Sequence, residues 1–83
     1  MVGEGTPREH IDATGLKCPE PVMLLHAAMR RLSPGDELTL DATDPSTERD
    51  VPNFCEFLGH LLLVAEHRDG VFHYRIQKSQ GEK

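Results

Sequence analysis

Four stretches of the chain have the alternating or apolar-rich pattern of β-strands. Residues 10–14, 37–43 and 71–78 alternate apolar with polar side chains, which predicts strands with one buried and one wet face. Residues 61–67 are rich in apolar side chains and precede an Asp-Gly pair at 69–70, a signal for a tight hairpin turn. We therefore expect two separated strands followed by a hairpin.

Two further stretches carry apolar residues at intervals of three or four positions, which predicts helices. The first covers residues 18–32 and begins at a Cys-Pro pair, with two arginines in its last turn, where the helix dipole favours cations. The second follows Asp44, a residue type that caps helices. Pro52 has no N–H to donate, so we expect a loose first turn over residues 45–50 and a kink or restart near Pro52. The buried stripe of this helix is expected to consist of Val51, Phe54, Cys55 and Leu58.

The predicted order of elements is βαβαββ, which indicates the α/β (α+β) class. Right-handed crossovers place both helices on one face of a four-stranded mixed sheet. If the first two strands are parallel, both helices begin at the same edge of the sheet, where open α/β sheets concentrate ligand chemistry. Cys18 and residues 44–50, remote in sequence, are then expected to lie at one end of the molecule.

Composition sets limits on size, partners and location. Eighty-three residues form one domain, which we place at residues 10–78 between tails at 1–9 and 79–83. A chain this short is not expected to enclose a deep substrate pocket, so another protein would complete any active site. Fourteen acidic residues against nine Lys and Arg give a net charge of −5, which argues against nucleic-acid binding. The sequence contains no apolar run of membrane-spanning length and no signal-peptide core, so we expect a soluble, cytoplasmic protein without a membrane partner.

Cys18 is the residue with the clearest chemical potential. Pro19 is expected at the first helical position, so the free N–H groups and positive end of the helix point at the sulfur and favour the thiolate, which is the nucleophile. Lys17 adds to this effect and Glu20 opposes it. The sequence therefore predicts a modestly lowered pKa for the Cys18 thiol.

The second cysteine and the histidines are not expected to take part in chemistry. Cys55 lies on the apolar stripe of the second helix, so we expect it to be buried and free, because the layout disfavours a bond to Cys18. No histidine pair has chelating i, i+4 spacing and no Cys-x-x-Cys is present, so no metal site is predicted. A Cys–His pair with His60 has no specific support. The five histidines, expected at the surface, are His10, His26, His60, His67 and His73.

The region after the second predicted strand can be interpreted in two ways. Asp44, Arg49 and Asp50 can cap and solvate the start of the second helix. Arg49 can also offer two parallel N–H donors to a carboxylate of a partner protein. Phe57 falls off the apolar stripe, and a partly exposed aromatic ring there would suit a docking surface.

Two blocks of sequence, residues 15–23 and residues 44–52 followed by Phe54-Cys55, closely resemble the TusA (SirA-like) family of sulfur carriers. The resemblance covers about residues 10–78, and the Cys-Pro-x-Pro motif with its Gly-Leu lead-in is specific. It implies a two-layer α/β sandwich and a sulfur atom carried as a persulfide on Cys18, without a cofactor. It also implies an IscS-like cysteine desulfurase as donor, a TusBCD-like (DsrE-type) acceptor, and 2-thiouridine at the tRNA wobble position as the product. We expect a monomer whose partner-binding residues are Pro19, Glu20, Pro21, Met23, Asp44, Arg49, Asp50 and Phe57.

Other functions stay open at this point. The same relay could serve dissimilatory sulfur oxidation or molybdenum-cofactor assembly. The βαβαββ layout also resembles the RNA-binding C-terminal domain of a bacterial translation initiation factor, but the acidic balance and Cys18 argue against such a non-catalytic module. A thiol-disulfide oxidoreductase is disfavoured because no second cysteine lies close to Cys18 in the sequence.

Overall fold

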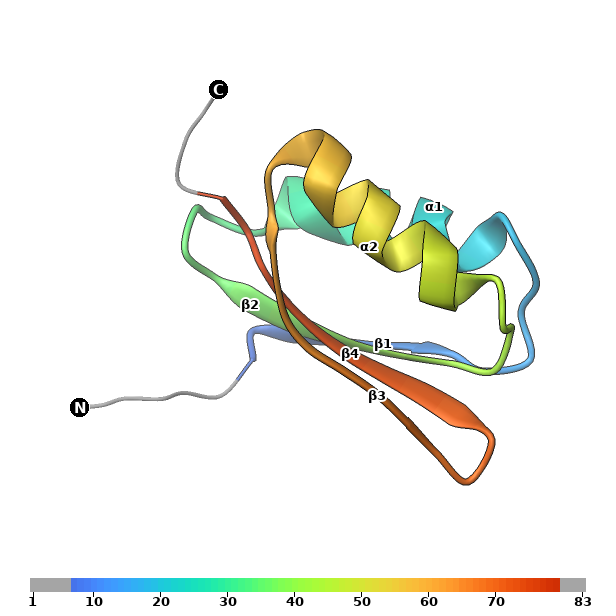
Figure 1. Ribbon diagram of the computed structural model, residues 1–83. Helices are drawn as coiled ribbons and strands as arrows, with labels where there is room; N and C mark the ends of the chain where they lie inside the picture. Colours follow the sequence, from blue (N-terminus) through green and yellow to red (C-terminus); the bar gives the residue numbers. More distant parts are fainter. Residues whose placement is uncertain (1–6, 80–83) are drawn as a thin grey trace.

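Six elements make up residues 7–79, the part of the chain that the computed structural model describes. Its four strands form one sheet in the order β1-β2-β4-β3, and both helices lie on the same face of it (Figure 1). The predicted βαβαββ order and the two-layer α+β sandwich are therefore confirmed. The elements are β1 (Glu9–Ala13), α1 (Glu20–Arg31), β2 (Glu37–Ala42), α2 (Thr47–Leu58), β3 (Leu61–Arg68) and β4 (Val71–Gln77).

The pairing of the strands brings the entrances of both helices to one side. β1 pairs in parallel with β2 and ends with Ala13 opposite Ala42, while β4 is antiparallel to both β2 and β3. Because β1 and β2 end at the same edge of the sheet, the loops that lead into α1 and α2 start from neighbouring positions (Figure 1). The sheet is mixed, as predicted.

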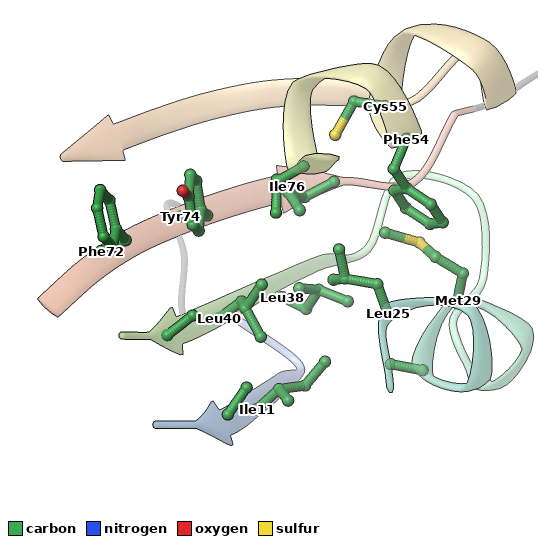
Figure 2. Close-up of a cluster of buried hydrophobic side chains, with 14 of the residues drawn as sticks. Ile11, Leu25, Met29, Leu38, Leu40, Phe54, Cys55, Phe72, Tyr74 and Ile76 are labelled. Atoms are coloured by element: carbon green, nitrogen blue, oxygen red, sulfur yellow. The ribbon is translucent and has the colours of Figure 1, made fainter. Parts of the chain in front are cut away.

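The core fills the space between the helices and the sheet (Figure 2). Alternate residues of β2 and β4 point into it, which explains the period of two in the sequence. Each fully buried leucine or isoleucine contributes roughly 1.5–3 kcal/mol relative to an exposed one. The largest fully buried side chains are Leu25, Leu38, Leu40, Ile76, Val51, Thr47 and Pro21.

The edge strand β3 is more exposed than its apolar sequence suggests. Leu61, Leu63 and Val64 are all exposed, and the pairing with β4 is irregular between Leu62 and Val64. Such a bulge twists an edge strand and makes it a poor template for pairing with other chains. The predicted hairpin turn follows, with positive φ at both Asp69 (53°) and Gly70 (80°), as in a type I′ turn.

Three local predictions differ from the structure. α1 begins at Glu20, so Pro19 is the N-cap residue rather than the first helical residue. α2 is one unbroken helix with Pro52 inside it, so the predicted restart is wrong. The turn before α2 is ordered by hydrogen bonds. The amides of Thr47 and Glu48 each donate to the carbonyl three residues earlier. Leu58 is 39% exposed and lies at the margin of the core rather than within it.

The end of the predicted N-terminal tail belongs to the fold. The Arg8 amide donates to the Glu37 carbonyl, and Glu9 is the first residue of β1. Glu9 also accepts two hydrogen bonds from the Arg31 guanidinium, which ties the edge strand to the end of α1. The tail predicted for residues 1–9 is therefore wrong at its last two residues, while residues 1–6 and 80–83 lie outside the described part. Between residues 7 and 79, no helix is both long and apolar enough to cross a membrane.

Candidate functional site

Two loops meet at the edge of the sheet where β1 and β2 end. The Gly15 amide donates to the Thr43 hydroxyl at 2.8 Å, and the Cys18 amide donates to Oδ2 of Asp44 at 2.6 Å. Both contacts join the loop before α1 to the loop before α2. The prediction that Cys18 and residues 44–50 lie together is therefore confirmed.

Asp44 organises both loops through its two carboxylate oxygens. Oδ2 accepts the Cys18 amide, and Oδ1 accepts the Ser46 amide at 3.0 Å. The Asp44 carbonyl also accepts the Thr47 hydroxyl at 2.8 Å. Hydrogen bonds from the amides of Ser46 and Cys18 hold the pKa of Asp44 below its ordinary value, because they favour the charged carboxylate. Ser46 is the N-cap residue of α2, and no side-chain hydrogen bond caps this helix. The predicted capping role of Asp44 is therefore wrong, because its carboxylate instead accepts the amides of Ser46 and Cys18 ahead of the two helices.

Cys18 presents a free thiol at the surface. This thiol donates a hydrogen bond to Oδ2 of Asp50 at 3.2 Å. The other oxygen of Asp50, Oδ1, accepts Nε of Arg49 at 3.1 Å. The peptide bond between Cys18 and Pro19 is cis. One side chain on the first turns of α2 thus contacts both the sulfur and a guanidinium.

The contact with Asp50 overturns the predicted pKa of Cys18. The hydrogen bond to the Asp50 carboxylate raises the pKa of the thiol above its ordinary value, and partial desolvation and the charges of Asp50 and Asp44 act in the same direction. Arg49 opposes this shift without reversing it. The prediction of a lowered pKa was wrong because it considered the end of α1 and omitted a carboxylate from α2. Cys18 therefore rests as a thiol at neutral pH.

A groove with a volume of about 740 Å³ extends from Cys18 between α1 and α2. Its lining is mainly apolar and includes the ring of Phe54, which is in edge-to-face contact with His26. Phe57 lies along it and is 86% exposed, which is unusual for a phenylalanine outside an interaction surface. The lining residues are Cys18, Pro19, Val22, His26, Asp50, Asn53, Phe54, Glu56, Phe57 and Leu58.

The predicted partner-binding residues fall into three groups. Pro19, Glu20, Met23, Arg49 and Phe57 are exposed around Cys18 and the groove, and Met23 is 59% exposed. Asp44 and Asp50 are half-buried and contact Cys18 directly.

Pro21 forms the third group, because it is fully buried. Its prediction as a partner-binding residue is wrong, since it is the second residue of α1 and lies on the side of the helix that faces the core. Its spacing of four from the buried Leu25 is the signal in the sequence that would have revealed this orientation.

Cys55 and His60, the remaining candidate residues, have structural rather than chemical roles. Cys55 is 3% exposed, and burial raises the pKa of its thiol to about 11, as expected for an inert core cysteine. Nδ1 of His60 accepts the Ser79 amide at 3.0 Å. Within residues 7–79, no group of three or more His, Cys, Asp and Glu is arranged to hold a metal ion.

Comparisons with known proteins identify relatives of this chain. The sequence model of the family described as Sulfurtransferase TusA matches residues 9–78. The chain is 56% identical over 73 residues to a Pseudomonas putida protein named sulfur carrier protein TusA, covering 88% of this chain and 91% of the relative. It is also 56% identical over 68 residues to a Pseudomonas aeruginosa protein of the same name, covering 82% and 86%.

A solved structure is similar in fold. The crystal structure of a SirA-like protein from Desulfitobacterium hafniense superposes with a TM-score of 0.77 at 25% sequence identity. The match covers 86% of this chain and 97% of that one.

Proposed function

The chain belongs to the TusA family of sulfurtransferases, and on that premise we propose that it carries sulfur as a persulfide on Cys18. The observation that carries the proposal is the exposed Cys18 thiol at the head of an apolar groove, fixed by a hydrogen bond on its amide and another on its sulfur. A carrier needs a sulfur that is reachable by two partners in turn and is held in a defined position. The buried Cys55 offers neither property.

The proposed reaction is a pair of thiol exchanges. The sulfur of Cys18 attacks the terminal sulfur of a donor cysteine persulfide, the donor S–S bond breaks, and the donor leaves as a thiol. Cys18-S-SH results, and a thiolate of the acceptor protein then attacks its outer sulfur and releases Cys18-SH. Each step breaks one S–S bond and forms another, so no oxidant, metal or cofactor is required.

We further propose the partners of this relay. The donor is an IscS-like cysteine desulfurase, the acceptor is a TusBCD-like protein, and the sulfur is destined for 2-thiouridine in tRNA. The carrier acts as a monomer in the cytoplasm, where thiols stay reduced. Both partners dock on the groove, because its apolar residues flank the sulfur. The exposed contact residues would be Pro19 and Phe57 on the groove, together with Glu20, Met23 and Arg49 outside its lining.

The test is direct transfer in solution. The protein is incubated with a cysteine desulfurase and cysteine, and the mass of one added sulfur is sought on the peptide that contains Cys18. The Cys18→Ser variant is the control, and Cys55 is an internal control thiol in the same chain. Added sulfur that persists in Cys18→Ser, or that is found on Cys55, would refute the assignment. Cysteine labelled on sulfur then reports whether the atom reaches total tRNA.

A further inference from the structure

The two oxygens of the Asp50 carboxylate have different partners. Oδ1 accepts Nε of Arg49 at 3.1 Å, which fixes the plane of the carboxylate. Oδ2 is left to accept the thiol of Cys18 at 3.2 Å. The side chain of Asp50 is 20% exposed, so it is better shielded from water than that of Arg49. The carboxylate is therefore oriented and aimed at the one atom that undergoes the chemistry.

Asp50 differs from the other charged groups around Cys18 in its contacts. Asp44, from the loop before α2, uses both of its carboxylate oxygens to accept backbone amides. Lys17 and Glu20 flank Cys18 in sequence and are exposed, and His26 lies further along the groove. Among the described residues, only Asp50 has a hydrogen bond to the sulfur of Cys18.

We propose that Asp50 is the general base for sulfur acceptance, taking the proton of Cys18 as the new S–S bond forms. This inference rests on the proposed persulfide function and assigns to Asp50 a catalytic role in place of the predicted partner contact. General bases act through a hydrogen bond to the proton that they remove, and the observed contact already has that arrangement.

The relative basicity of Cys18 and Asp50 explains why the proton stays on sulfur before the reaction. A carboxylate is a weaker base than a thiolate, so the resting pair is a thiol and a carboxylate, in agreement with the raised pKa of Cys18. As the sulfur of Cys18 bonds to the terminal sulfur of the donor, it loses basicity and its proton passes to Oδ2 of Asp50. The donor S–S bond breaks, and the departing donor sulfur takes the proton from Asp50. Asp50 ends the step as a carboxylate.

The experiment uses the full chain and glutathione persulfide as the sulfur donor, because this small donor does not depend on protein docking. Asp50→Asn removes the base and keeps the shape of the side chain. Glu48→Gln removes one charge from the same end of α2 at an exposed position and is the matched control. Two rates are measured at Cys18 by mass spectrometry: addition of sulfur, and alkylation by iodoacetamide, which reports the thiolate.

The two rates should move in opposite directions in Asp50→Asn. Alkylation is expected to rise about three- to tenfold at neutral pH, because the thiolate no longer faces a negative charge. Sulfur acceptance is expected to fall at least about tenfold, because the proton has no acceptor. Glu48→Gln should leave both rates unchanged. A rise in both rates, a fall in both rates, or no change would overturn the proposal.

A second variant and the wild-type protein complete the test. Asp50→Glu retains a carboxylate on a longer side chain, so it should keep more of the acceptance rate than Asp50→Asn. Equal losses in the two variants would show that the carboxylate is not the base. Thermal unfolding curves confirm that each variant is folded. A wild-type protein that gains no sulfur on Cys18 would refute the persulfide function itself, an outcome distinct from a loss confined to the Asp50 variants.

Discussion

Cys18 and Asp44 are 26 positions apart in the sequence, and the amide of the first donates to Oδ2 of the second at 2.6 Å. The same carboxylate accepts the Ser46 amide, so one side chain orders the approach to both helices. Asp44 is therefore the residue that fixes the backbone on which the reactive sulfur is carried.

Replacement of Asp44 should loosen Cys18 without removing its thiol. In Asp44→Ala we expect faster hydrogen exchange at the Cys18 amide and a fall of about tenfold in sulfur acceptance, because small misplacement of reacting atoms has large kinetic effects. Asp44→Asn keeps an oxygen that can accept the same amide and should lose less. Unchanged exchange at Cys18 in Asp44→Ala would show that the hydrogen bond does not restrain this loop.

Phe57 should affect protein partners and leave the chemistry unchanged. Its ring is 86% exposed beside the groove, and truncation of an aromatic interface residue commonly costs about 1–2 kcal/mol of binding. Phe57→Ala is therefore expected to raise KM for a cysteine desulfurase by roughly five- to thirtyfold at similar kcat. Stability should stay within about 0.5 kcal/mol.

Glutathione persulfide provides the control for Phe57, since this donor needs no docking surface. Phe57→Ala should accept sulfur from it at the wild-type rate. Equal losses with the small donor and with the desulfurase would place Phe57 in the chemistry or in the fold rather than at an interface.

Substitutions of two leucines should differ in their effect on stability, because one leucine lies in the core and the other on the edge strand. Leu40 is fully buried on β2, and Leu40→Ala is expected to lower the free energy of unfolding by about 2–5 kcal/mol, because it leaves a cavity in the core. Leu61 is 53% exposed on β3, and Leu61→Ala should cost less than about 1 kcal/mol. Urea unfolding of both variants measures the difference, and similar losses would contradict the arrangement of the sheet.

The buried thiol of Cys55 should make stability fall in alkali. Burial raises its pKa from 9.0 to about 11, so between these values the folded chain holds a proton that the unfolded chain has released. The free energy of unfolding should therefore decrease as pH rises through this window, by up to about 3 kcal/mol. Burial also raises the pKa of Tyr74, which adds a decrease of the same sign.

Cys55→Ala isolates the contribution of the thiol, because Tyr74 is present in both proteins. Urea unfolding from about pH 8 to about pH 11 should give a flatter profile for Cys55→Ala than for the wild type. Parallel profiles would mean that Cys55 ionises in the folded state as easily as in the unfolded one.

Periodicity and topology were enough to predict most of the fold. The alternation around Leu40 predicts β2. The right-handed crossover rule, together with parallel first strands, predicts that Cys18 lies near residues 44–50. The burial of Cys55 follows from its place on the helical stripe. These features depend on which way a side chain faces, and the pattern of apolar residues records that directly.

The details of the site depend on rotamers and loop paths that no period encodes. Asp50 and Asp44 are both acidic residues near the start of α2, and the sequence does not say which of them reaches the sulfur and which the amide. The expected lowering of the Cys18 pKa by the helix dipole is overcome, because the hydrogen bond from the thiol to the Asp50 carboxylate raises this pKa. The exposure of β3 was also missed, since an apolar sequence does not reveal that a strand lies at an edge.

The division of the site between two loops has a consequence for biosynthesis. A ribosome completes Cys18 well before it adds Thr43, Asp44 and Asp50, so the nascent chain carries its nucleophile without any of the groups that hold it. Cys18 gains its position and its proton partner only when β2 has paired with β1 and α2 has formed. Truncated translation products that end before β2 therefore contain a Cys18 whose amide and thiol lack both of these hydrogen bonds.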